Sequence, residues 1–186
     1  MKRFPAALCG LMLLLTLLPP AVSTAGSDTK VTLFPVNDTD QLETHAWLDC
    51  KLPRTCDFIA GVQLRTPEGV TGFPDGLWAK QSTEVRSNNR TTYLDVHTAG
   101  GEGWYADRGG PGTKVFKEGG NAVIQSMYNG AGPPEKYQTV GTIDVTDWST
   151  GLPKTGDKIY VCAHVQVVYP GVNLTTPATC AKATFG

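Results

Sequence analysis

Three polar side chains, Ser82, Asp95 and His97, are of the types that form a hydrolytic triad. A nucleophilic hydroxyl needs a base beside it, and the base needs a group that orients it. We expect all three on one exposed face of a β-hairpin, where side chains diverge into solvent. No G-x-S-x-G elbow occurs in the sequence, and nothing near these residues indicates an oxyanion hole. We therefore interpret them as part of a solvated sheet, with no catalytic residues and no enzymatic activity. A secreted hydrolase with an unrecognised site is the alternative.

The hairpin that would position these residues consists of two alternating runs, 77–87 and 90–98, on either side of Asn88-Asn89. Asparagine tolerates the left-handed backbone of a two-residue hairpin turn. Setting Ser87 opposite Arg90 places Ser82 by Asp95 and Lys80 by His97 on the wet face. The opposite face is half apolar, as an antiparallel sheet with one exposed side requires.

Two other clusters could hold a metal or a reactive thiol, and we expect neither. Asp38, Asp40 and Glu43 lie close together in sequence, but the spacing and the glycine of a calcium-binding EF-hand are absent. We interpret 37–40 as a polar turn, and the capping-box spacing of 40–43 allows one helical turn after it. Cys162 and His164 are two residues apart on one strand face, which is the arrangement of a thiol and its base. A bridged Cys162 supplies no thiolate. The sequence therefore predicts no metal site and no cofactor.

Four cysteines follow the N-terminal segment: Cys50, Cys56, Cys162 and Cys180. An even number in an exported chain points to disulfides, and locality favours Cys50–Cys56 and Cys162–Cys180 among the three formal pairings. Gly171 lies nine residues from each cysteine of the second pair, so a hairpin centred there places the two sulfurs opposite each other. A structural zinc site is the alternative, although the gaps are not typical of zinc ligands.

The stretch 157–182 shows the clearest period-2 alternation in the chain, broken by Pro170-Gly171. Pro177 then requires an unpaired edge, because proline has no amide hydrogen. Further strands are expected at 31–36, 44–50, 57–64, 114–117, 122–128 and 139–148. Together they predict an all-β domain of about eight strands, either an antiparallel β-sandwich of immunoglobulin-like form or a small barrel, closed by two disulfides.

The first 25 residues have the grammar of a secretory signal peptide: Lys2-Arg3, an apolar run at 8–18, and small residues before Gly26. Residues 26–186 would then form a single secreted, extracytoplasmic domain without a transmembrane segment. Removing Lys2 and Arg3 changes the net charge from −1 to −3, because no acidic residue is removed with them. This mild acidity argues against nucleic acid as a partner, and a chain of this length can bury a core as a monomer.

In the strand expected within 157–182, Tyr160-Val161-Cys162 resembles the Tyr-x-Cys of immunoglobulin-like sandwiches, in which the tyrosine closes a corner two residues before a cysteine. The spacing of Asp157 to Cys162 departs from that pattern by one residue. A signal peptide followed by a small glycine-rich β domain is also similar to exported actinobacterial proteins of unknown function. Neither resemblance implies a functional residue.

Aromatic residues lie among glycine-rich stretches at Trp104, Tyr105, Tyr128 and Tyr137. Loops held by a rigid scaffold often carry function, so these four are the candidate ligand-binding residues. The ligand would be a glycan, a lipid, a peptide or a protein, and the protein a non-enzymatic binding module. Two alternatives stay open: that buried rings merely anchor long connections, and that the protein is a structural component of the cell envelope.

Overall fold

The computed structural model describes residues 26–89, 91–99, 113–118 and 120–184, with no side-chain description for 113–118. Nearly all of this is β-structure. Twelve strands follow in order: β1 (Ser27–Pro35), β2 (Gln41–Lys51), β3 (Thr55–Thr66), β4 (Gly69–Thr71), β5 (Trp78–Ser87), β6 (Thr92–Ala99), β7 (Thr113–Glu118), β8 (Asn121–Asn129), β9 (Gln138–Asp147), β10 (Lys158–Tyr169), β11 (Val172–Thr175) and β12 (Thr179–Thr184). The 3-10 turn η1 (Pro134–Tyr137) precedes β9. In the described part of the chain, no helix is long and apolar enough to cross a membrane.

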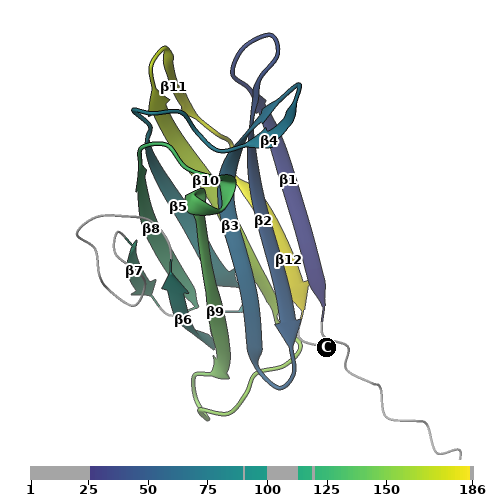
Figure 1. Cartoon of the computed structure of the whole chain (residues 1–186). Coiled ribbons are helices and arrows are strands. Elements are labelled where there is room, and N and C mark those ends of the chain that lie inside the picture. The colour runs from purple at the N-terminus through teal and green to yellow at the C-terminus, as the bar shows by residue number, and fades with distance from the viewer. Residues whose placement is uncertain (1–25, 90, 100–112, 119, 185–186) are drawn as a thin grey trace, which may run out of the picture.

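The strands form two antiparallel sheets that pack face to face (Figure 1). The first sheet has the order β1-β2-β3-β9-β6, with β4 beside β3, and the second has the order β11-β10-β5-β8-β7, with β12 beside β10. Each sheet turns its buried side chains toward the other, as strands with period-2 alternation do in a sandwich. The predicted all-β sandwich is confirmed, and the sheets do not close into a barrel. The strands are more numerous than the eight expected, and most of the expected ones extend beyond their predicted bounds.

The predicted hairpin between β5 and β6 is wrong. β5 pairs with β10 and β8 in the second sheet, whereas β6 pairs with β9 in the first. Asn88-Asn89 therefore lies in a corner where the chain crosses between sheets. Alternation predicted two strands that each bury one face, which is correct. It could not tell a hairpin from a crossing, because both give each strand one apolar and one wet face.

The hairpin of β10 with β11 and β12 matches its prediction closely, with one local difference. Cys162 is the direct cross-strand partner of Cys180, as expected. The turn itself has two residues, Pro170 and Gly171, since Tyr169 pairs with Val172. The extra residue is accommodated at 176–178, between β11 and β12, where Pro177 lies outside both strands. Proline has no amide hydrogen to donate, so its position outside both strands costs no hydrogen bond between strands.

Each disulfide joins two neighbouring strands of the same sheet, one disulfide in the first sheet and one in the second. Cys50–Cys56 closes the β2–β3 hairpin with a Cα–Cα distance of 3.9 Å, and Cys162–Cys180 joins β10 to β12 at 4.0 Å. Both predicted pairings are confirmed, and they indicate an oxidising compartment. Tyr160 lies beneath the guanidinium of Arg86, 4.4 Å from Cζ to the ring centre. Neither a bridge between sheets nor a tyrosine corner is present among the described residues, so these two immunoglobulin features are not reproduced.

Hydrogen bonds cross the core between its two apolar clusters. One cluster surrounds Phe58 and Ile124, and the other surrounds Leu42 and Phe73. Between them, the buried Thr139 hydroxyl of β9 lies 2.7 Å from Ser126 Oγ and 2.8 Å from the Tyr128 hydroxyl, both on β8. Because β8 and β9 belong to different sheets, these contacts fix how the two layers sit on each other.

The first turn of the chain is polar, as expected, but no helical turn follows it. Asn37 Oδ1 accepts hydrogen bonds from the backbone amides of Thr39 and Asp40, at 2.8 Å each. Strand β2 begins at Gln41, and Glu43, which the capping-box pattern placed in a helix, is buried in that strand. It is paired there with Arg65 of β3. The carboxylate of Glu43 thus has a cross-strand partner, which favours the strand over a cap.

Candidate functional site

The structure does not bring Ser82, Asp95 and His97 together. Asp95 and His97 lie on the outer face of the first sheet, with His97 Nε2 3.2 Å from Asp95 Oδ2. Ser82 lies on β5, between the buried residues Gln81 and Thr83, and therefore faces outward from the second sheet. The core of the sandwich separates the serine from the histidine and carboxylate. This rules out the one triad that the sequence offered.

Ser82 instead lies opposite His164 of β10. Gln125 Nε2 donates a hydrogen bond of 2.9 Å to the Ser82 hydroxyl oxygen, and His164 is exposed. These residues and Lys80 line a shallow polar basin of about 200 Å³ on the outer face of the second sheet. Within the described residues, the His164 ring makes no hydrogen bond that would orient it toward the serine. The basin can contact a polar surface, but it lacks an arranged nucleophile and base.

The other candidate ligands form no metal or thiol site among the described residues. His45 of β2 is half-buried, and burial lowers its pKa, although Glu43 acts in the opposite direction. Its Nδ1 has no hydrogen-bond partner among the described residues. Asp38, Asp40 and Glu43 form no group that could hold a metal, and no such group of three acidic, histidine or cysteine side chains occurs in the described residues. Cys162 is bridged, so His164 has no thiolate beside it.

Two of the four candidate ligand-binding aromatics belong to the core. Tyr128 and Tyr137 are both 0% exposed. Burial raises the pKa of Tyr128, and the Tyr137 hydroxyl donates a 2.8 Å hydrogen bond to the carbonyl of Gly130. Rings without accessible surface cannot contact a ligand directly, so for these two residues the anchoring interpretation holds. Trp104 and Tyr105 lie outside the described residues, and their binding role stays a prediction.

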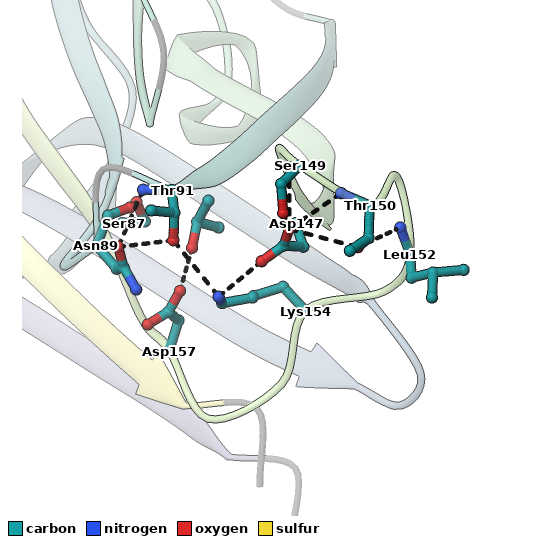
Figure 2. Close-up of polar contacts among 10 residues, drawn as sticks. Ser87, Asn89, Thr91, Asp147, Ser149, Thr150, Leu152, Lys154 and Asp157 are labelled. Atoms are coloured by element: carbon teal, nitrogen blue, oxygen red, sulfur yellow. Dashed lines mark hydrogen bonds and ion pairs between the residues drawn. The ribbon is translucent and has the colours of Figure 1, made fainter.

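A polar network at the end of the sandwich where β9 finishes has a structural role (Figure 2). Asp147 accepts hydrogen bonds from the Ser149 hydroxyl at 2.5 Å and from Lys154 Nζ at 2.9 Å. These contacts, with Ser149 the stronger, hold the pKa of Asp147 well below its ordinary value. Lys154 Nζ also lies 3.4 Å from the Thr91 hydroxyl, which ties the turn to the corner between β5 and β6. The Asp147 carboxylate and the Lys154 ammonium are thus engaged by the turns themselves, which gives the network a structural role.

A second hollow, larger than the polar basin, lies at the opposite end of the sandwich. It is a groove of about 510 Å³ between the β1–β2 turn, the segment after β4 and the β10–β11 turn. These three segments lie at the top of Figure 1. We call it the end groove. Its apolar lining consists of Val36, Leu64, Phe73, Pro74, Tyr169, Pro170 and Val172. Its polar lining includes Asn37, Asp40 and Thr71.

Close backbone packing and stacked rings shape the floor of the end groove. A Cβ at Gly72 would lie 1.7 Å from the carbonyl oxygen of Gly132, so only glycine allows this approach. Phe73 is thereby held against Tyr137, edge to face, with 4.9 Å between ring centres, and 6.0 Å from the ring of Tyr169. Tyr137 thus supports the groove from beneath without reaching it.

Asp40 dominates the electrostatics of the end groove. It is the one charged side chain among the lining residues, which include no lysine or arginine. Burial raises the pKa of Tyr169, and the negative charge of Asp40 raises it further. The groove thus combines an apolar aromatic floor with a carboxylate at its rim. The sequence pattern did not reveal it, because its residues come from separate turns; the one available signal was the polar turn at 37–40.

The arrangement of strands defines the protein as a disulfide-bonded antiparallel β-sandwich. Comparison with family models and with curated proteins gave no match. Among solved structures, the chain is similar to the GAE domain of GGA2p from Saccharomyces cerevisiae, with 8% sequence identity and a TM-score of 0.34. That alignment covers 82% of this chain and 96% of the other.

Proposed function

We propose that this protein is a non-enzymatic binding module that works outside the cytoplasm and holds its ligand in the end groove. The observation that carries the proposal is the groove itself, which is about 510 Å³ in volume and has seven apolar residues among the eleven that line it. Ligand sites typically have volumes of about 300–1,000 Å³, apolar walls and a few placed polar groups. The two disulfides support an oxidising location outside the cytoplasm.

The rigidity of the walls adds to this proposal. The groove lies against the second apolar cluster, which includes Leu64 and Phe73 and against which Val36, Tyr169 and Val172 pack. A preformed site loses little conformational freedom on binding, so its contacts contribute more fully to affinity. A purely structural component of the envelope would have no need of such a hollow.

The test compares the oxidised wild-type chain with a groove variant on two ligand sources, a glycan array and a phage-displayed library of random dodecapeptides. Tyr169→Ala removes a half-buried aromatic wall of the groove. Trp148→Ala is the matched control, since Trp148 is 67% exposed and follows β9 at the opposite end. We expect at least one ligand whose affinity falls ten-fold or more in Tyr169→Ala and stays unchanged in Trp148→Ala.

Because Tyr169→Ala removes packing as well as a contact surface, its folding is checked by thermal unfolding. Thr71→Arg supplies a second groove variant that removes no buried group, since Thr71 is exposed. Ligands that bind both groove variants as well as wild type would overturn the proposed site. The absence of any ligand on either source would favour the structural alternative.

A further inference from the structure

We propose that the ligand of the end groove is an extended polypeptide segment that carries a lysine or arginine beside apolar residues and that adds to the free edge of β11. This inference rests on the function proposed above and specifies its ligand. Three features of the described residues carry it: the charge of the groove, the engagement of its polar groups, and the strand that borders it.

The charge of the groove favours a cation. Asp40 lies at the rim, near enough to Tyr169 to raise the pKa of its hydroxyl, and no basic residue lines the groove to neutralise it. Two further acidic residues, Asp38 and Asp75, are exposed in the turns that form the walls. A ligand ammonium or guanidinium at the rim would complement this charge, while an apolar neighbour would cover the floor.

Hydrogen bonds within the β1–β2 turn already engage Asn37 and part of Asp40, which leaves few free polar groups to bind a sugar. The side-chain amide nitrogen of Asn37 donates a hydrogen bond of 3.0 Å to Asp40 Oδ2. Its side-chain oxygen, Oδ1, accepts from the backbone amides of Thr39 and Asp40 and from the Thr39 hydroxyl. Asp40 Oδ1 accepts from the same hydroxyl at 3.1 Å. Sugar hydroxyls need many free donors and acceptors, whereas apolar side chains of a peptide need none. The apolar residues that make up most of the lining, among them Phe73, Tyr169 and Val172, fit the peptide.

The strand that borders the groove can pair with an extended chain. Val172 lines the groove and is also the first residue of β11. Among the described residues β11 pairs with β10 alone, so it is an edge strand of the second sheet. An extended peptide that enters the groove can continue along this edge, gaining main-chain hydrogen bonds while the groove selects its side chains. Figure 1 shows β11 at the same end of the sandwich as β4 and the β1–β2 turn.

Two substitutions at one exposed position test the charge. Thr71→Arg and Thr71→Glu place side chains of similar length but opposite charge in the groove. The probe is the peptide most enriched by the oxidised wild-type chain from the random dodecapeptide library, synthesised with a fluorophore. We expect it to contain lysine or arginine next to an apolar residue. Its Kd should rise ten-fold or more in Thr71→Arg and stay equal or fall in Thr71→Glu.

The strand pairing is tested on the same peptide by methylating its backbone nitrogens one at a time. Methylation removes one main-chain donor and keeps the side chains. We expect the Kd to rise about ten-fold at alternate positions and little at those between, because successive amides of a strand point to opposite sides. A uniform response along the peptide would overturn pairing with β11.

The outcomes separate this inference from the function on which it rests. An enriched peptide without basic residues, equal weakening by both Thr71 variants, or binders found only on the glycan array would overturn the cationic peptide while leaving the groove as the site. Binders that neither Thr71 variant nor Tyr169→Ala weakens would overturn the groove itself.

Discussion

Ser82 and His164 are direct cross-strand neighbours on β5 and β10, and both face away from the core on the outer side of the second sheet. The serine oxygen accepts a hydrogen bond from Gln125, and the histidine ring is exposed. Proximity alone does not make a nucleophile, because the base must be oriented and the developing oxyanion must be stabilised.

We therefore expect the oxidised chain to hydrolyse p-nitrophenyl acetate no faster than Ser82→Ala and His164→Ala variants do. Any residual rate should come from exposed histidine and lysine side chains in general, so it should change little when one of them is replaced. The measurement is the initial rate at pH 8 with matched protein concentrations. A ten-fold drop in either variant would show that the pair is catalytic and would revive the hydrolase hypothesis.

Under native conditions, dithiothreitol should reduce Cys162–Cys180 before Cys50–Cys56. Cys180 is exposed, whereas Cys50 and Cys56 are both 0% exposed and lie in the core. Thiolate attack requires access to sulfur, so the buried bridge should open only as the protein unfolds. Alkylation followed by tryptic mass spectrometry measures this, since Cys162 and Cys180 stay within the peptide 159–182. Earlier alkylation of Cys50 would contradict the expected order.

Replacing both Cys162 and Cys180 by alanine should lower the free energy of unfolding by about 3 kcal/mol, as expected for opening a loop of this length. The two cysteines are separated by 18 residues in sequence. Urea unfolding of the double variant against wild type gives the value. A loss below about 1 kcal/mol would mean that the strand pairing of β10 and β12 holds the loop without the bridge.

Local patterns predicted the strands and both disulfides, but not which strands pair. The alternation around Cys162 and Pro170-Gly171 specified both a strand and its turn, because neighbouring residues along the chain determine each. The pairing of β3 with β9, or of β5 with β10, depends on contacts between segments far apart in sequence. Asn88-Asn89 fitted a hairpin turn equally well, and only packing of the two sheets made it a corner.

The candidate site was less predictable for the same reason. Tyr128 and Tyr137 have the composition of binding loops, but both fill the space between the sheets, where aromatic area is most stabilising. The residues that line the end groove come from three separate turns and from the strands beside them. Neither their spacing nor their residue types mark them as a group, so their convergence follows from the topology alone.

Thr139→Val should lower the free energy of unfolding by about 1–3 kcal/mol, because it removes two buried hydrogen bonds between the sheets. Thr139 is 0% exposed and contacts both Ser126 and the Tyr128 hydroxyl. Valine has nearly the same shape, so the loss reports the hydrogen bonds across the sheets. Thr142→Val, a partly exposed position on the same strand, is the control and should change stability by less than about 0.5 kcal/mol. Equal effects of the two substitutions would contradict a bonding role for Thr139.

Stability should also fall as the pH drops below about 6.5, the ordinary pKa of histidine, through His45. Burial lowers the pKa of His45 in the folded chain, so below pH 6.5 the unfolded chain binds a proton that the folded chain does not. Protonation then favours unfolding until the pH reaches the lowered folded pKa, below which the loss stops growing. The ring is closely packed, with Nε2 2.9 Å from the position that a Cβ would take at Gly61.

His45→Gln isolates this contribution, because glutamine does not titrate and every carboxylate is unchanged. We expect urea unfolding midpoints of the wild type to fall more steeply than those of His45→Gln between pH 7.5 and 5. His164→Gln is the matched control, since the His164 ring is exposed, and it should keep the wild-type slope. Parallel slopes for wild type and His45→Gln would mean that the ring accepts its proton in the folded protein as readily as in the unfolded chain.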